Sequence, residues 1–242
     1  MRKDVSVDTP TFYEADIDDY NCIVMEQNDP VHVIVVEGNI SSGKTTMMEH
    51  LVSKGYTCYP ENVAEWMPYL EELYNSDEKQ TDMLQMRITL DQFKILKNIQ
   101  NLKDVKRLPN GKKVVFIERW IGASEDVFIK GAMNAEYTTI TPKGIKMWRD
   151  LVELSGLRDL KIDAFIYIHS EPKEAHARIL KRAQVRKSER SVAYDYVESI
   201  HNLYESYMSK CDNVITIYNT DATKEDFCKR AYDVVVDSLH TM

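Results

Sequence analysis

The stretch Val33-Ile34-Val35-Val36-Glu37-Gly38-Asn39-Ile40-Ser41-Ser42-Gly43-Lys44-Thr45-Thr46 decides the fold. A β-branched apolar run ends at a glycine, four residues intervene, and Gly-Lys-Thr then precedes a helical pattern that begins at Met47. This order of strand, glycine-rich loop and helix is that of a P-loop. Its backbone amides and the positive end of the helix form a nest for phosphate oxygens. The sequence therefore predicts a site for a nucleoside triphosphate.

Two residues of this loop carry the chemistry of a nucleotide site. The ammonium group of Lys44 can reach the outer phosphates, and the hydroxyl of Thr45 can hold a magnesium ion. We expect ATP to contact the whole loop, namely Gly38, Asn39, Ile40, Ser41, Ser42, Gly43, Lys44, Thr45 and Thr46.

Length and composition are those of one ordinary domain, which we place at 31–242. A chain of 242 residues can bury a core without disulfides. The net charge of -8 argues against a nucleic-acid partner, which requires a basic surface. No apolar run approaches the roughly 20 residues of a membrane-spanning helix. The four cysteines are widely spaced and match no metal-ligand pattern, so we expect reduced thiols in the cytoplasm.

The segment 1–30 is rich in Asp and Glu, whereas a mitochondrial transit segment is basic. We interpret it as a flexible acidic lead-in without a targeting role. An alternative is that Phe12, Tyr13 and Tyr20 anchor it to the domain.

The rest of the chain alternates short apolar strands with helical patterns. Further strands are expected at Tyr56–Tyr59, Val114–Ile117, Ala164–Ile168 and Val214–Ile217. Helical patterns cover about 44–53, 66–105 with a break near 75–77, 124–131, 142–155, 171–182 and 194–210, and a last one ends near 239. This alternation predicts an α/β fold whose five-stranded parallel sheet is flanked by helices on both faces.

One helical stripe bears on ligand binding. Apolar residues recur at helical spacing and predict a buried face; they are Met83, Leu84, Met86, Leu90, Phe93, Leu96 and Ile99. Gln85 lies next to this stripe and can present a two-sided amide to a planar base, although most such glutamines are merely solvated.

Charged residues follow two of the predicted strands. Glu61 comes just after the second strand, and Glu118 and Arg119 end the third. Ligands of parallel sheets gather at the carboxyl ends of the strands. We therefore expect these side chains to serve in chemistry rather than in a core.

Residues 178–190 hold six Lys or Arg residues against a single acid, Glu189. Such a segment is often a solvated helix face. Beside a P-loop, the alternative is an arginine-rich lid at about 182–191 that folds over the triphosphate and stabilises charge in the transition state.

The order of these features resembles that of the deoxynucleoside kinases, a family that includes deoxycytidine kinase, mitochondrial thymidine kinase and a broad-specificity insect enzyme. The resemblance runs from Val31 to Leu239 and rests on the glycine loop, Glu61, Trp66, Tyr74, Gln85, Glu118-Arg119, the basic segment with Glu189, and Glu225-Asp226-Phe227. It implies a P-loop kinase that transfers the γ-phosphoryl group of ATP, with Mg²⁺, to the 5′-hydroxyl of a deoxyribonucleoside, and it implies a homodimer.

The resemblance also implies roles for single residues. Glu61 corresponds to the general base, while Glu118 resembles an acid near both the magnesium ion and the same hydroxyl, so that either can accept the proton. Arg119 would hold the 5′-oxygen or the incoming phosphate. Tyr74 and Glu189 resemble the pair that binds the 3′-hydroxyl.

The base and the donor have their own implied contacts. Gln85 would pair with the base edge, and Trp66 and Phe128 would line the ring. Arg178 and Arg182 resemble lid arginines, and Asp226 and Phe227 resemble the loop beside the donor's adenine.

The chain departs from the family pattern in three ways. Trp120 stands where the family's Glu-Arg-Ser motif has serine. The lid is two residues longer, which leaves Arg186 or Gln184 at the position of a third lid arginine. Gln92 and Ser124 replace an Arg-Asp pair of members that accept purines or prefer cytosine, so the resemblance implies a pyrimidine-preferring pocket that takes thymidine.

Two other hypotheses fit parts of the pattern. A monophosphate kinase such as thymidylate kinase shares the P-loop and the lid, but the carboxylate of Glu61 would repel an acceptor phosphate. A noncatalytic nucleotide-binding protein is the second hypothesis, and Trp120 is the residue that favours it.

Overall fold

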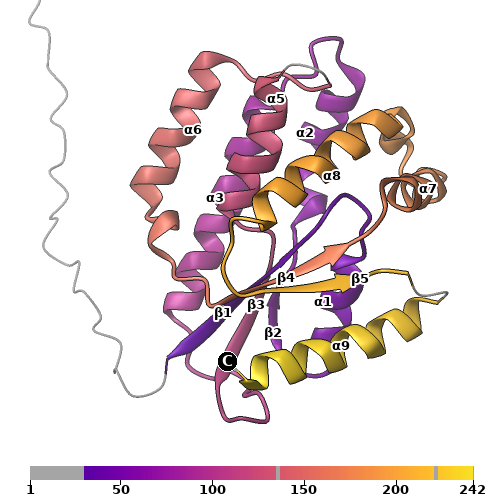
Figure 1. Cartoon of the computed structure of the whole chain (residues 1–242). Coiled ribbons are helices and arrows are strands. Elements are labelled where there is room, and N and C mark those ends of the chain that lie inside the picture. The colour runs from indigo at the N-terminus through magenta and orange to yellow at the C-terminus, as the bar shows by residue number, and fades with distance from the viewer. Residues whose placement is uncertain (1–29, 135–136, 221–222, 242) are drawn as a thin grey trace, which may run out of the picture. The chain divides into compact units, whose positions relative to one another are not determined.

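The computed structural model describes residues 30–134, 137–220 and 223–241 (Figure 1). A compact unit runs from Val31 to Met242. The acidic segment 1–30, including the suggested anchors Phe12, Tyr13 and Tyr20, lies outside the described residues except for Pro30. The division of the chain at this point therefore stays a prediction.

Five parallel strands form the sheet, in the order β2-β3-β1-β4-β5. They are β1 (Val31–Glu37), β2 (Thr57–Tyr59), β3 (Lys113–Glu118), β4 (Ala164–His169) and β5 (Val214–Tyr218). The strand that leads into the P-loop is central, so the loop emerges between β3 and β4 at the carboxyl end of the sheet. The predicted five-stranded parallel sheet is confirmed.

Helices connect the strands. The α-helices are α1 (Lys44–Ser53), α2 (Val63–Asn75), α3 (Asp82–Gln100), α4 (Ile121–Ala123), α5 (Lys130–Met133), α6 (Pro142–Ser155), α7 (Pro172–Arg182), α8 (Tyr194–Met208) and α9 (Lys224–Thr241). A π-helical segment, η1 (Ser124–Ile129), lies between α4 and α5, and short 3₁₀ helices form η2 (Leu157–Asp159) and η3 (Lys187–Ser191). Among the described residues, no helix has both the length and the apolar character that crossing a membrane requires.

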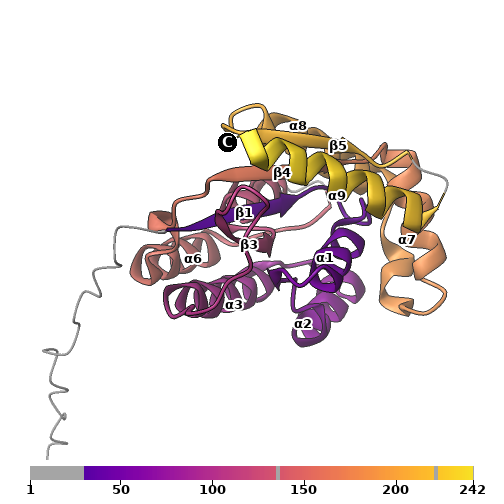
Figure 2. The same ribbon diagram turned by 90° about the horizontal axis from the view of Figure 1, so that it is seen from below.

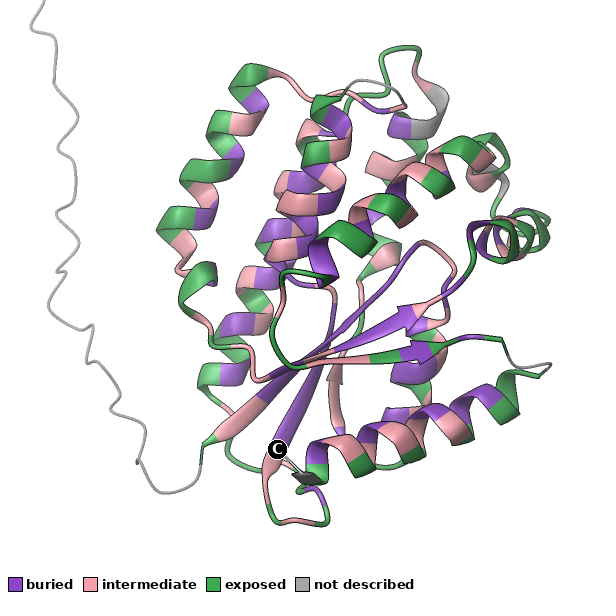
Figure 3. Cartoon of the chain, viewed as in Figure 1, coloured by how far each residue is buried: buried purple, intermediate pink, exposed green. Residues whose placement is uncertain are grey.

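Successive side chains of each strand point to opposite faces of the sheet, and a hydrophobic core forms on each face. Ile34 and Val36 of β1 pack with α1 and α9, whereas Val33 and Val35 pack with α3 and α6. A further cluster on the second face joins Tyr167 of β4 to α8. Figures 1 and 2 show this arrangement of helices around the sheet, and Figure 3 shows the strands buried at its centre. Burial on both faces explains why these strands are continuously apolar.

Helix α3 differs from its predicted pattern. The prediction that Met83 and Leu90 belong to the buried face is wrong, because they are 59% and 41% exposed. Gln85, Thr89 and Gln92 are buried instead. The helix thus turns a partly polar face inward, and a buried polar face calls for a polar partner.

Candidate active site

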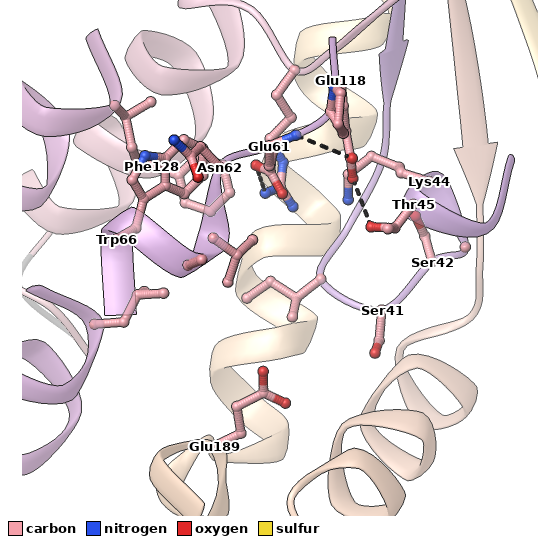
Figure 4. A pocket seen from close by; sticks show the side chains of 18 of the residues that line it. Ser41, Ser42, Lys44, Thr45, Glu61, Asn62, Trp66, Glu118, Phe128 and Glu189 are labelled. Atoms are coloured by element: carbon pink, nitrogen blue, oxygen red, sulfur yellow. Dashed lines mark hydrogen bonds and ion pairs between the residues drawn. The ribbon is translucent and has the colours of Figure 1, made fainter. Parts of the chain in front are cut away.

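A cavity of about 1000 Å³ lies at the carboxyl end of the sheet. Its walls come from the P-loop, the β2–α2 loop, α2, α3, the end of β3, η1, and the α7–η3 segment. Figure 4 shows Lys44, Thr45 and Glu118 together on one side, Trp66 and Phe128 on the other, and Glu61 between them. We call the part formed by Ile40–Thr46, Glu118 and Arg119 the loop side; Gly38 and Asn39 of the predicted loop do not line the cavity. The part formed by the inward face of α3 with Trp66 is the helix side.

The P-loop has the backbone that its glycines predict. Gly38 has a φ of 146°, and a Cβ there would meet the carbonyl oxygen of Ile168 at 2.5 Å. Gly43, with a φ of 115°, caps the first turn of α1. Lys44 is buried, and its Nζ donates to the carbonyl oxygens of Gly38 at 3.0 Å and Asn39 at 2.9 Å. The carbonyl oxygens of the loop therefore hold its ammonium group in place.

Burial, together with the neighbouring charge of Arg119, lowers the pKa of Lys44 to about 8, although the carboxylates of Glu61, Glu118 and Glu37 oppose the change. A cation with a depressed pKa gains from a nearby anion. Phosphate oxygens supply such a charge, so this lysine favours an anionic ligand.

The carboxylate of Glu118 connects the P-loop to Glu61. Its Oε1 accepts from the hydroxyl of Thr45 at 3.1 Å, and its Oε2 accepts from the backbone amide of Glu61 at 3.3 Å. Burial and the neighbouring carboxylate of Glu61 raise the pKa of Glu118. A hydroxyl beside a carboxylate is an oxygen donor set that suits Mg²⁺. The predicted metal residues, Thr45 and Glu118, thus lie together and fit this ion.

Arg119 lies directly after β3 with a φ of 58°, a left-handed conformation that is costly for a residue other than glycine. Its guanidinium pairs with Glu61, donates to the hydroxyl of Tyr204 at 2.9 Å, and lies 5.0 Å from the ring centre of Phe128. Burial alone would lower the pKa of Arg119, but Glu61 and its other anionic neighbours raise it well above its ordinary value. The structure therefore brings together the predicted residues Glu61, Glu118, Arg119 and Phe128.

A buried carboxylate beneath Arg119 is absent from the sequence prediction. Glu37 ends β1, is fully buried, and accepts from the Trp120 amide at 3.1 Å and from the Tyr204 hydroxyl at 3.3 Å. Burial raises the pKa of Glu37 to about 7, although Arg119 opposes the change. The position of Glu37 at the end of an apolar strand could have identified it from the sequence. No sequence pattern indicates Tyr204, which lies on the distant helix α8.

Trp120 does not line the cavity. Its side chain is 3% exposed and packs into the core with Val35, Ile117 and Trp148. The departure from the family's serine therefore changes packing behind the site, and the polar contact at this position is made by the backbone amide. The one sequence feature that favoured a noncatalytic protein thus lies outside the cavity.

The helix side carries neutral polar groups. Gln85 and Gln92 are buried in the wall of the cavity, and the Oε1 atom of each has no hydrogen-bond partner among the described residues. A buried acceptor without a hydrogen bond costs free energy, so each of these oxygens is expected to accept from a donor. Trp66 is held by its Nε1, which donates to Asp91 at 2.7 Å. Asp91 is a cavity residue that sequence reasoning missed, although its place beside Gln92 on the same face was visible.

Ser124 and Phe128 reach the cavity from η1, the π-helical segment after β3. Segments of this type often occur at functional sites because they redirect side chains. Ser124 is 4% exposed. The side chain of Tyr74, predicted to bind the sugar, lies outside the described part of the structure.

The basic segment lies at the mouth of the loop side. Arg178 donates to the Ser170 hydroxyl at 2.8 Å and to the Asn219 carbonyl oxygen at 3.1 Å. Arg182 pairs with Glu189 at 2.7 Å, and Arg186 pairs with the same carboxylate at 3.5 Å. All three arginines and Glu189 line the cavity. Their predicted role in a lid stays a prediction.

Asp226 and Phe227 are predicted to lie beside the adenine of the donor, and one of the two lines the cavity. Phe227 lines the cavity beside Gly43. Asp226 does not, because it is engaged at the start of α9, where its carboxylate accepts from the Thr223 hydroxyl at 2.6 Å. Asn219, which the sequence did not single out, lines the cavity and donates to the Ser42 carbonyl oxygen at 2.6 Å.

Known proteins resemble this chain along most of its length. The model of the family described as deoxynucleoside kinase matches residues 34–242. A protein of Invertebrate iridescent virus 3 that is named as a kinase is 31% identical over 194 residues, which are 80% of this chain and 90% of the viral protein. The mitochondrial thymidine kinase 2 of Homo sapiens is 24% identical over 192 residues, which are 76% of this chain and 67% of the human protein.

A solved structure supports the same fold. Deoxyadenosine kinase from M. mycoides superposes with a TM-score of 0.67 at 22% sequence identity, over 87% of this chain and all of its own. Together these comparisons show an enzyme that uses a nucleotide to phosphorylate deoxynucleosides, and they favour neither the monophosphate kinase nor the noncatalytic protein. By the match of its residues 34–242, the chain belongs to the deoxynucleoside kinase family.

Proposed function

We propose that this kinase transfers the γ-phosphoryl group of ATP to the 5′-hydroxyl of a deoxyribonucleoside and prefers thymidine and deoxycytidine, as a step in the salvage of DNA precursors. One observation carries the proposal. A carboxylate, Glu61, lies between a phosphate-binding loop and a wall of neutral amides, in one cavity large enough for two ligands. Such a wall suits an uncharged nucleoside, while the loop suits a triphosphate.

Glu61 is the proposed general base. Its carboxylate pairs with Arg119, which holds it at the boundary of the two sides. It accepts the proton of the 5′-hydroxyl as that oxygen attacks the γ-phosphorus, and Arg119 then stabilises the charge that develops on the phosphoryl oxygens. Glu118, which touches both Thr45 and Glu61, is the alternative acceptor.

Thr45 and Glu118 are the proposed magnesium residues. When bound, the ion would neutralise charge on the β- and γ-phosphates. Three carboxylates, Glu37, Glu61 and Glu118, surround Lys44 and Arg119 in this region. Because two of these carboxyls have raised pKa values, added positive charge at the site is favourable.

The α7–η3 segment is the proposed lid. Glu189 pairs with both Arg182 and Arg186. We infer that the arginines exchange this carboxylate for the phosphates of ATP, which frees Glu189 for the 3′-hydroxyl of the sugar. Arg186 lines the cavity and Gln184 does not, which supports Arg186 as the third lid arginine.

The proposed pyrimidine preference rests on the helix side. Gln85 offers both a donor and an acceptor to the edge of a base, and Trp66 and Phe128 offer ring faces. Gln92 and Ser124 leave the same wall without the charged pair that the resemblance associates with purines and cytosine.

The experiment is a panel of the four deoxynucleosides at fixed ATP and magnesium. We expect higher kcat/KM for thymidine and deoxycytidine than for deoxyadenosine and deoxyguanosine. A purine nucleoside as the best substrate would overturn the base preference but leave the kinase activity intact. Thymidine monophosphate, assayed beside thymidine, should accept no phosphate, because Glu61 would repel it.

A homodimer is the proposed assembly. Helices α3 and α6 share a core cluster, and both expose large apolar side chains one heptad apart: Met83 and Leu90 on α3, and Met147 and Leu154 on α6. Leu154 is 87% exposed, which is unfavourable in a monomer. Light scattering should give twice the mass of one chain. The double variant Leu154→Glu, Met147→Glu should give the mass of a single chain. An unaltered dimer in that variant would place the interface elsewhere.

We also propose a cytoplasmic location. Cys58, Cys211 and Cys228 are free thiols, and burial raises the pKa of each, as expected of unreactive cysteines in a reducing compartment. Imaging of the tagged full chain in a host cell tests this location, and accumulation in an organelle would contradict it.

A further inference from the structure

A second cluster of ligand-type side chains lies where β4 meets α8, outside the cavity. His169 is the last residue of β4, and His201 and Glu205 lie one turn apart on α8. One ligand atom from each of the three lies within 4.8 Å of the other two. None of these residues lines the nucleotide cavity. The cluster therefore needs an explanation separate from phosphoryl transfer.

The contacts within the cluster orient its members toward one another. The Nε2 atom of His169 lies 3.6 Å from Oε1 of Glu205, and the two imidazole rings have their centres 5.1 Å apart. The hydroxyl of Tyr167 donates to Oε1 of Glu205 at 2.6 Å. An outer hydrogen bond of this kind fixes a carboxylate that ligates a metal.

His201 supplies an independent observation. Its Nδ1 atom is shielded from solvent and has no hydrogen-bond partner among the described residues. Buried polar atoms are seldom left unmet in folded proteins. A bound cation would satisfy this ring nitrogen.

We propose that His169, His201 and Glu205 bind Zn²⁺, with water at the remaining position. Two imidazoles and a carboxylate are a common set of three protein ligands for zinc, at about 2.0 to 2.2 Å. In a tetrahedral site such ligand atoms lie about 3.3 Å apart, close to the separation of His169 and Glu205. Glu205 is 49% exposed, so water can reach the remaining position.

The proposed ion differs in chemistry and in role from a nucleotide-bound magnesium. Imidazole suits zinc, whereas Mg²⁺ prefers oxygen ligands. Zinc at this position would hold the end of β4 to α8. Tyr204, next to Glu205 on α8, donates to Glu37 and accepts from Arg119. The ion would therefore stabilise the helix that supports the buried network beneath the cavity.

Calorimetric titration of the metal-stripped full chain with Zn²⁺, in excess Mg²⁺ and a phosphine reductant, tests the proposal. We expect one zinc ion per chain. Loss of an outer partner alone weakens metal binding by about 10- to 100-fold, so Glu205→Gln and His201→Ala, which each remove a ligand, should weaken it at least as much. Glu205→Gln keeps an acceptor for Tyr167 at an exposed position, so folding is preserved. His240→Ala, at an exposed histidine near the chain end, is the matched control and should bind as the wild type does.

Two further readouts separate this site from binding at thiols. Co²⁺ in place of Zn²⁺ should give ligand-field absorption without a thiolate charge-transfer band. Saturating Zn²⁺ should raise Tm by at least about 3 °C in the wild type and leave Glu205→Gln unchanged. A thiolate band, an absence of zinc binding, or equal affinity in the three variants would each overturn the proposal.

Discussion

The loop side and the helix side of the cavity are built in opposite ways. On the loop side the charged groups are held by protein partners: Lys44 by two carbonyl oxygens, Glu118 by Thr45, and Arg119 by Glu61 and Tyr204. On the helix side, Gln85 and Gln92 each keep a buried oxygen without a partner among the described residues. One side is organised by contacts within the protein, and the other leaves polar atoms for a ligand to satisfy.

This difference indicates which residues determine the rate of phosphoryl transfer and which determine the choice of nucleoside. Groups fixed before the ligand arrives act on charge in the transition state without reorganising. Buried groups that lack a partner reject a ligand that fails to pair with them, which is a source of specificity. The loop side should therefore set kcat for every nucleoside, while the helix side should set the ratio of one base to another.

The largest effect is expected on the loop side, from Glu61→Gln. If Glu61 is the general base, kcat falls by about 10²- to 10⁴-fold with a modest change in KM. The loss should be equal for thymidine and deoxycytidine, because the residue contacts neither base. Steady-state kinetics with both substrates measure it.

Glu65→Gln is the matched control, because this acid lies four residues further on in the first turn of α2, is 62% exposed, and among the described residues pairs only with Arg87. It should leave kcat within about twofold. An unchanged kcat in Glu61→Gln would transfer the role of base to Glu118 or to no residue. A loss confined to one base would contradict the division between the two sides.

The next effect concerns the packing beneath the loop side. Trp120→Ser removes an indole that is 3% exposed, and large-to-small changes of this size cost about 3 to 5 kcal/mol. The amide that binds Glu37 remains, so kcat of the folded enzyme at low temperature should change by less than about tenfold. Urea unfolding gives the first quantity and kinetics the second.

The control is Val52→Ser, at a position on α1 that is 54% exposed, which should cost less than about 0.5 kcal/mol. If Trp120→Ser were as stable as the wild type, the indole would not be a core residue. If instead it raised kcat sharply, Trp120 would be restraining the site after all.

The third effect is a dependence of stability on pH. Burial raises the pKa of Glu37 from 4.5 to about 7, so its protonated form stabilises the folded protein fully below 4.5, and this contribution is lost as the pH rises through about 7. Glu37→Gln is neutral at every pH. Relative to this variant, the wild type should therefore lose about 2 to 3 kcal/mol between pH 5 and pH 8.

Urea unfolding of both proteins over that range measures the difference. Glu49→Gln replaces an exposed acid that pairs with Lys224, and its stability should stay within about 0.5 kcal/mol of the wild type. A difference between Glu37→Gln and the wild type that does not vary with pH would mean that the loop side tolerates an ionised carboxylate beneath Arg119.

The sequence predicted the loop side more fully than the helix side for a physical reason. Gly38, Lys44 and Thr45 act through local backbone geometry, which a short motif encodes. Glu61 and Glu118 follow strands, and parallel strands bring such residues together. Tyr204 and Asp91 take part through tertiary contacts that no local pattern reports. The exposed Met83 and Leu90 show the same limit, because apolar spacing does not reveal which face of a helix meets a cavity.

The smallest expected effect is a change of base preference on the helix side. Gln92→Arg with Ser124→Asp introduces a charged pair in place of two neutral groups in the cavity wall. A hydrogen-bonding difference of about 1 to 3 kcal/mol changes the ratio of kcat/KM by roughly tenfold or more. We expect the ratio of deoxycytidine to thymidine to rise by about tenfold while kcat for deoxycytidine changes little.

The single variants locate the effect. Gln92→Arg alone buries a cation without its partner and should lower stability and activity, and Ser124→Asp should restore both. Asn98→Arg adds the same charge at an exposed position of α3 and should leave the ratio unchanged. If the double variant lowered kcat for all bases alike and did not move their ratio, the helix side would share the catalytic role of the loop side, because a wall that only selects a base cannot slow every substrate equally.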